Sequence, residues 1–102
     1  AQTTGSVCDA ILTPEPGALT FPILRRAAGP GLAVSDEEAL RAVAIAAARL
    51  KIVLEPGGAV ALAAALFHAH RIEGDAAVCV ASGGNADPAL FAATIARFGT
   101  GD

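Results

Sequence analysis

The most regular pattern in the chain runs from residue 35 to residue 50, where a polar, acidic start leads into an alanine-rich stretch. Ser35 and Glu38 have the spacing of a capping box, in which each side chain accepts a hydrogen bond from the backbone amide of the other residue. The acidic side chains also favour the positive end of a helix. The pattern therefore predicts a helix that starts at Ser35 and ends near Leu50 or Lys51.

A second helix is predicted from residue 59 to about residue 70, after the turn Glu55-Pro56-Gly57-Gly58. Pro56 prevents one continuous helix, and the two glycines permit a change of direction. This helix is apolar on almost every side before its two histidines, so it must be covered on every side. We expect the rest of the chain to leave one apolar face uncovered, and the covering surface to belong to protein outside these residues.

Shorter elements lie around these two helices. Val78 and Val80 favour a core strand, while Asp87 and Pro88 are a helix N-cap and a helix-starting proline. The additional predicted elements are helices over 19–28 and 89–98 and β-strands over 32–34 and 75–81. A strand followed by a turn and a helix is typical of a parallel sheet. We therefore predict an α/β fold, with a helix-flanked parallel sheet whose other strands are missing from this chain.

Composition limits the fold to one small domain without an internal boundary. The chain has 102 residues, of which 54% are hydrophobic, but alanine dominates and there are four Phe and no Trp, Tyr or Met. The net charge is −3 and the basic residues are scattered, which argues against a nucleic-acid surface. The uncharged stretch 56–67 is shorter than the about 20 residues that span a bilayer, so we expect no membrane segment.

The cysteines and histidines do not have the spacing of a metal site. Cys8 and Cys79 are isolated and form no zinc or disulfide pattern, so we expect both thiols to be reduced and buried, as in a cytoplasmic protein. His68 and His70 are two residues apart and lie on different helix faces, which favours surface or capping positions. The chain starts without Met and without a secretory pattern, which suits a fragment or a processed chain.

Two glycine-containing turns are the candidates for a binding site. Ser82-Gly83-Gly84-Asn85 follows the predicted strand, at the strand end where open α/β sheets bind ligands. A hydroxyl and two glycines let a ligand approach the backbone, although an ordinary strand-to-helix turn explains the same residues. Glu55 is a candidate site carboxylate in the other turn. Lys51 is the only lysine of the chain, but its place at a helix end favours interaction with the helix dipole.

Five segments in order resemble one enzyme family, the pyridoxal-phosphate-dependent serine/threonine dehydratases of fold type II, which also contains serine racemase. The segments are Ser-Val-Cys-Asp-Ala at 6–10, Gly-Ala-Leu-Thr-Phe-Pro-Ile at 17–23, Val-Ser-Asp-Glu-Glu at 34–38, Glu-Pro-Gly-Gly-Ala at 55–59 and Ser-Gly-Gly-Asn-Ala-Asp at 82–87. Ala10 departs from the glycine usual in its segment. The resemblance implies a tryptophan synthase β-like fold, with residues 1–102 as a C-terminal fragment of its large cofactor-binding domain.

The resemblance also implies roles for individual residues. Ser82 corresponds to the hydroxyl that hydrogen-bonds the pyridine nitrogen of the cofactor, with Gly83 and Glu55 beside the ring. A neutral hydroxyl leaves that nitrogen largely unprotonated, which suits elimination over transamination. In the racemase branch, residues at the places of Lys51 and Asn85 contact a nucleotide effector.

The implied activity belongs to a longer enzyme. The family's imine-forming lysine, its phosphate-binding loop and its cation site lie upstream, so we expect no catalytic residue in this chain and no activity from it alone. The parent enzyme would be a cytoplasmic, homo-oligomeric ammonia-lyase that converts L-threonine or L-serine to a 2-oxo acid and ammonia. Alternatives on the same framework are serine or aspartate racemisation and hydroxyaspartate dehydration. An alternative of another class is a small module that binds an anion at the Ser82 turn and the Asp87-Pro88 helix start without chemistry.

Overall fold

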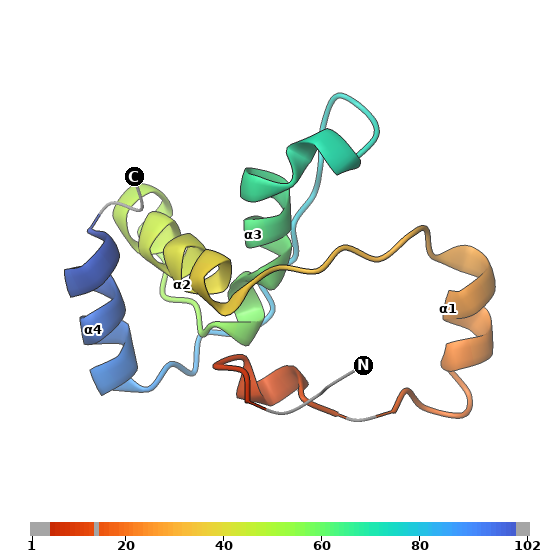
Figure 1. The fold of residues 1–102 in the computed structure, drawn as a ribbon, viewed down its shortest axis with the longest axis horizontal. Coiled ribbons are helices and arrows are strands. Elements are labelled where there is room, and N and C mark those ends of the chain that lie inside the picture. Colours follow the sequence, from red (N-terminus) through yellow and green to blue (C-terminus); the bar gives the residue numbers. More distant parts are fainter. Residues whose placement is uncertain (1–4, 14, 100–102) are drawn as a thin grey trace.

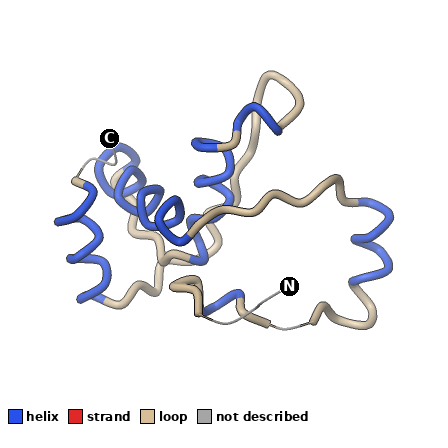
Figure 2. Tube along the Cα trace, viewed as in Figure 1, coloured by secondary structure: helices blue, strands red, loops and turns tan. Residues whose placement is uncertain are grey.

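The computed structural model describes residues 5–13 and 15–99, and within these the chain folds into four α-helices joined by shorter helical turns and extended segments (Figures 1 and 2). The α-helices are α1 (Phe21–Ala27), α2 (Asp36–Ile45), α3 (Val60–Phe67) and α4 (Pro88–Phe98). The shorter turns are η1 (Asp9–Ile11), η2 (Ala46–Leu50), η3 (Gly57–Ala59) and η4 (Ala69–Arg71).

The predicted capping box starts α2. The amide of Glu38 donates to Ser35 Oγ at 3.1 Å, and the amide of Ser35 donates to Glu38 Oε1 at 2.8 Å. The helix continues to the predicted end, but its last turn, η2, is a wider π-type turn. This turn ends at Lys51, whose φ of 60° is left-handed and stops the helix.

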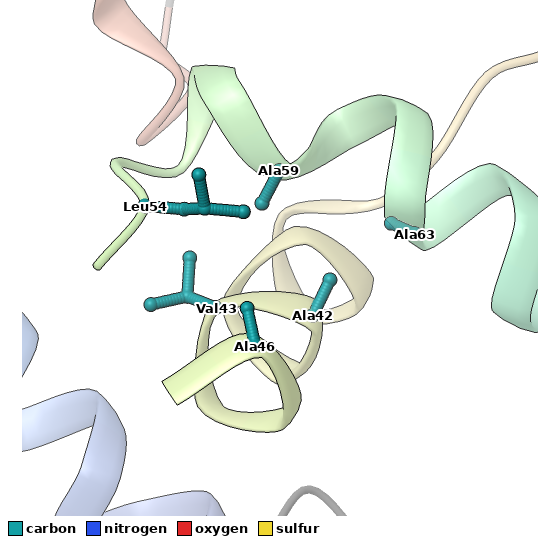
Figure 3. Packing of buried hydrophobic residues seen from close by; sticks show 6 residues of the cluster. All are labelled: Ala42, Val43, Ala46, Leu54, Ala59 and Ala63. Atoms are coloured by element: carbon teal, nitrogen blue, oxygen red, sulfur yellow. The ribbon is translucent and has the colours of Figure 1, made fainter. Parts of the chain in front are cut away.

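A seam of alanines joins α2 to α3 and forms the centre of the core (Figure 3). Side chains this small let two helix backbones approach closely, so the seam packs tightly although it contains little apolar volume. Val43 and Leu54 are its only larger buried members. The buried cluster comprises Ala42, Val43, Ala46, Leu54, Ala59 and Ala63. This packing fixes where η3 and the turn before it lie.

The expected uncovered apolar face is present on α3. Ala63 is the only residue of this helix that is buried, and Leu66 is 43% exposed. The helix ends at Phe67, earlier than predicted, and η4 follows after His68. The described residues therefore do not enclose α3.

Helix α1 lies apart from the other helices, at the end of two extended segments (Figure 1). Every described residue from 15 to 31 is exposed, and Leu19 is 87% exposed. The radius of gyration is 14.2 Å, larger than the about 13 Å of a compact chain of this length. The helix was predicted over 19–28 and forms over a shorter span.

The two predicted β-strands do not form within the described residues, which contain no strand (Figure 2). Segments 32–34 and 75–81 run without strand hydrogen bonding, and Val78 is 97% exposed. A strand needs a neighbouring strand to pair with its amides and carbonyls, and the described residues supply none. The prediction at α4 is confirmed, because the amide of Leu90 donates to Asp87 Oδ2 at 2.9 Å and Pro88 opens the helix.

Both cysteines are free, as predicted. Cys8 is buried, and burial raises the pKa of its thiol. Cys79 is only half-buried, because the segment around it does not pack into a sheet. Among the described residues, no helix combines the length and the apolar character that a bilayer crossing requires.

Candidate functional site

The two predicted glycine turns lie against each other, although they are separated by more than twenty residues in the sequence. The amide of Glu55 donates to the carbonyl of Gly83 at 3.1 Å. The first segment leads from the end of η2 into η3, and the second connects the extended segment after η4 to α4 (Figure 1). The alanine seam holds the first segment in place, so it provides a fixed surface for the second.

Three glycines make this approach possible because none of their positions has room for a side chain. A β-carbon on Gly58 would lie 2.8 Å from the nitrogen and 3.2 Å from the carbonyl carbon of Gly83, and closer still to its oxygen. A β-carbon on Gly84 would lie 2.5 Å from the carbonyl oxygen of Val53, and one on Gly83 would overlap the carboxylate of Glu55. The two backbones are therefore in direct contact.

Ser82, Gly83 and Glu55, the predicted cofactor-binding residues, are thus brought together. Ser82 is exposed and its hydroxyl has no hydrogen bond to the described residues. Glu55 is half-buried, with its carboxylate against the α-carbon of Gly83. The arrangement offers a free neutral hydroxyl, a carboxylate and a backbone without side chains. A ligand could therefore approach the backbone closely at this turn and form a hydrogen bond with the Ser82 hydroxyl.

Lys51 and Asn85, the predicted effector residues, are not joined by a hydrogen bond in the described part of the chain. The ammonium of Lys51 donates to the carbonyl of Ala48 at 2.6 Å, which satisfies one free carbonyl at the end of η2. Both side chains are exposed.

Several polar contacts around α2 were not predicted from the sequence. The carboxylate of Asp36 accepts hydrogen bonds from Ser6 Oγ at 2.6 Å and from the amide of Val7 at 3.2 Å, which attaches the first described segment to the start of α2. His68 Nε2 lies 2.9 Å from Glu38 Oε2 and thereby connects the end of α3 to the capping box. The sequence gives no sign of these pairs because their partners are about thirty residues apart.

The charge of Glu38 is stabilised by its surroundings. The hydrogen bond from the Ser35 amide, followed by the contact with His68, lowers the pKa of this carboxyl group. The described residues contain no group of three or more side chains that could hold a metal ion.

Comparison with known proteins finds matches over most of the chain. Residues 1–83 match a family described as pyridoxal-phosphate dependent enzymes. L-threonine ammonia-lyase of Geobacter sulfurreducens is 35% identical over 92% of this chain and 23% of its own length. Serine racemase of Schizosaccharomyces pombe is 34% identical over 89% of this chain and 28% of its own length.

A third relative is named for another substrate. L-threo-3-hydroxyaspartate ammonia-lyase of Saccharomyces cerevisiae is 32% identical over 92% of this chain and 29% of its own length. The chain thus spans about a quarter of the length of the curated relatives that it matches.

Proposed function

We propose, from the premise that this chain belongs to the family of pyridoxal-phosphate dependent enzymes, that it is the C-terminal part of an ammonia-lyase that converts L-threonine or L-serine to a 2-oxo acid and ammonia. The observation that supports this most is the contact between Glu55 and the Ser82–Gly84 turn. It joins the two segments whose residues resemble the cofactor site, and it leaves the Ser82 hydroxyl free.

In this proposal the described residues contact one edge of the cofactor. When bound, pyridoxal phosphate supplies an electron sink for the carbanion formed at the substrate's α-carbon. Ser82 would donate a neutral hydrogen bond to the ring nitrogen, and Gly83 would let the ring approach the backbone. Because a hydroxyl is a much weaker acid than the protonated ring nitrogen, it orients the ring without protonating it. Glu55 would add a carboxylate beside the same edge.

The relatives favour elimination as the reaction. Two of the three named relatives are ammonia-lyases, and one of these is named for threonine. The racemase is nearly as similar to this chain, at 34% identity against 35%. Family membership favours an enzyme over the alternative of a small anion-binding module.

The remaining parts of the proposal concern the whole enzyme. The chain alone should be inactive, because the cofactor requires a lysine that forms an imine with it. Lys51 is the only lysine of the chain, and its ammonium donates a hydrogen bond to the carbonyl of Ala48 at the end of η2. We place the imine-forming lysine, the phosphate loop and a cation site in the rest of the enzyme. We also propose a cytoplasmic homo-oligomer, and a nucleotide contact at Lys51 and Asn85.

The test uses the purified full-length enzyme, loaded with pyridoxal phosphate and supplied separately with L-threonine, L-serine and L-threo-3-hydroxyaspartate. We expect 2-oxo acid and ammonia to form in equal amounts from threonine or serine. Ser82→Ala removes one neutral hydrogen bond, worth about 0.5–1.5 kcal/mol, so cofactor affinity should fall about tenfold at most. Formation of D-serine without 2-oxo acid would show that the enzyme is a racemase instead. Turnover of hydroxyaspartate alone would show that the substrate is neither threonine nor serine. Failure to bind the cofactor would overturn the proposal.

A further inference from the structure

We propose that Gly58 and Gly84 are positioning residues that hold the Ser82 hydroxyl in place through direct backbone contacts at two points. The proposal rests on the proposed function, since it takes the cofactor as the group that Ser82 contacts. Neither glycine touches the cofactor in this account. Each acts by fixing the backbone on which Ser82 is carried.

Gly58 supports the peptide unit that directly follows the Ser82 α-carbon. A β-carbon at position 58 would lie 2.8 Å from the nitrogen of Gly83, and this nitrogen belongs to the peptide bond between Ser82 and Gly83. The carbonyl of the same Gly83 accepts the hydrogen bond of the Glu55 amide at 3.1 Å. The residue after Ser82 is therefore held by a hydrogen bond and by a contact surface at the same time.

Gly84 supports the turn from its other end. A β-carbon at position 84 would lie 2.5 Å from the carbonyl oxygen of Val53. Val53 belongs to the segment that runs directly into Leu54, a buried member of the alanine seam. The turn thus rests against a segment that the core of the chain holds in place, and it cannot move closer to that segment.

Gly57 provides a matched comparison within the same helical turn, η3. A β-carbon at position 57 would lie 3.6 Å from Ile11 Cγ2, which is an ordinary van der Waals distance. Gly57→Ala therefore fits without movement, whereas Gly58→Ala forces the Ser82–Gly83 peptide to move away. A shift of about 0.5 Å is enough to misalign a group that must meet a ligand atom.

The test is a double-mutant cycle in the full-length enzyme. Cofactor dissociation constants are measured by titrating apoenzyme with pyridoxal phosphate for wild type, Gly58→Ala, Ser82→Ala and the double variant. We expect Gly58→Ala to weaken cofactor binding by about three- to tenfold, the range of one lost hydrogen bond. In the Ser82→Ala background the same substitution should change affinity less than about twofold, because the hydroxyl that it displaces is already absent. Gly57→Ala should leave the affinity at the wild-type value.

The outcomes separate this inference from the proposed function. If Ser82→Ala leaves cofactor affinity unchanged, the role of Ser82 in the proposed function is wrong. Suppose that Ser82→Ala weakens binding. If Gly58→Ala then has the same effect in the wild-type and Ser82→Ala backgrounds, or leaves the affinity unchanged as Gly57→Ala should, only the positioning role is overturned. Thermal denaturation of each apoenzyme checks folding. If Gly58→Ala does not fold, the same cycle with Gly84→Ala decides between coupled and independent effects.

Discussion

Replacing Ser35 by alanine removes the hydroxyl that caps α2, and we expect the local stability of this helix to fall by about 1 kcal/mol. The hydroxyl accepts the Glu38 amide at 3.1 Å, and without it this amide has no partner in the helix. The cap is exposed to water, which can replace part of the lost hydrogen bond. The cost should therefore lie in the middle of the range of about 0.5–2 kcal/mol.

Hydrogen–deuterium exchange of the full-length enzyme measures this change locally. A loss of about 1 kcal/mol should make the amides of α2 (Asp36–Ile45) exchange about fivefold faster. Thr20→Ala is the matched control, because Thr20 occupies the N-cap position of α1 and its side chain makes no capping hydrogen bond. Equal exchange of α2 in wild type and Ser35→Ala would refute the reasoning.

Glu38, the second residue of the capping box, predicts that the stability of α2 depends on pH. The pKa of Glu38 is lowered in the folded chain, so its stabilising contribution is complete above the ordinary glutamate pKa of about 4.3 and is lost as the pH falls through the lowered value. Glu38→Gln keeps an acceptor for the Ser35 amide but cannot titrate. Exchange of α2 should therefore respond to acid less in Glu38→Gln than in wild type, and an identical response would contradict the assignment.

Two more predictions concern the thiols and the packing around α2. Alkylation followed by peptide mapping should find Cys8 and Cys79 both unpaired, with Cys8 reacting more slowly in the native enzyme because it is buried and the pKa of its thiol is raised. Arg41→Ala should lower the free energy of unfolding by about 1–2 kcal/mol in thermal denaturation, because the guanidinium lies 5.9 Å from the ring centres of both Phe67 and Phe98.

The helix starts could be predicted from the sequence because their causes are local. Ser35 with Glu38, and Asp87 with Pro88, satisfy the first amides of α2 and α4 with atoms at most three residues away. The strands predicted at 32–34 and 75–81 do not form within the described residues, because a strand depends on a partner strand that these residues do not supply. The π-type last turn, η2, also has no local signal that the sequence pattern reveals.

The candidate site was partly predictable. The resemblance pointed to Ser82, Gly83 and Glu55, and the structure brings these residues together. The specific roles of Gly58 and Gly84 could not be inferred from the sequence, since a glycine in a turn gives no indication of which backbone it contacts. A contact between distant segments is set by tertiary packing, here by the alanine seam that fixes the turn after Leu54.

The most direct test of the account is the Ser82→Asp variant of the full-length enzyme, with the release of 2-oxo acid from L-threonine and the visible absorption of the bound cofactor recorded over a range of pH. A carboxylate at this position would favour protonation of the ring nitrogen, so we expect a changed absorption spectrum and a large loss of elimination activity. If Ser82→Asp keeps both the spectrum and the elimination rate of the wild-type enzyme, Ser82 does not face the cofactor and the proposed site is wrong.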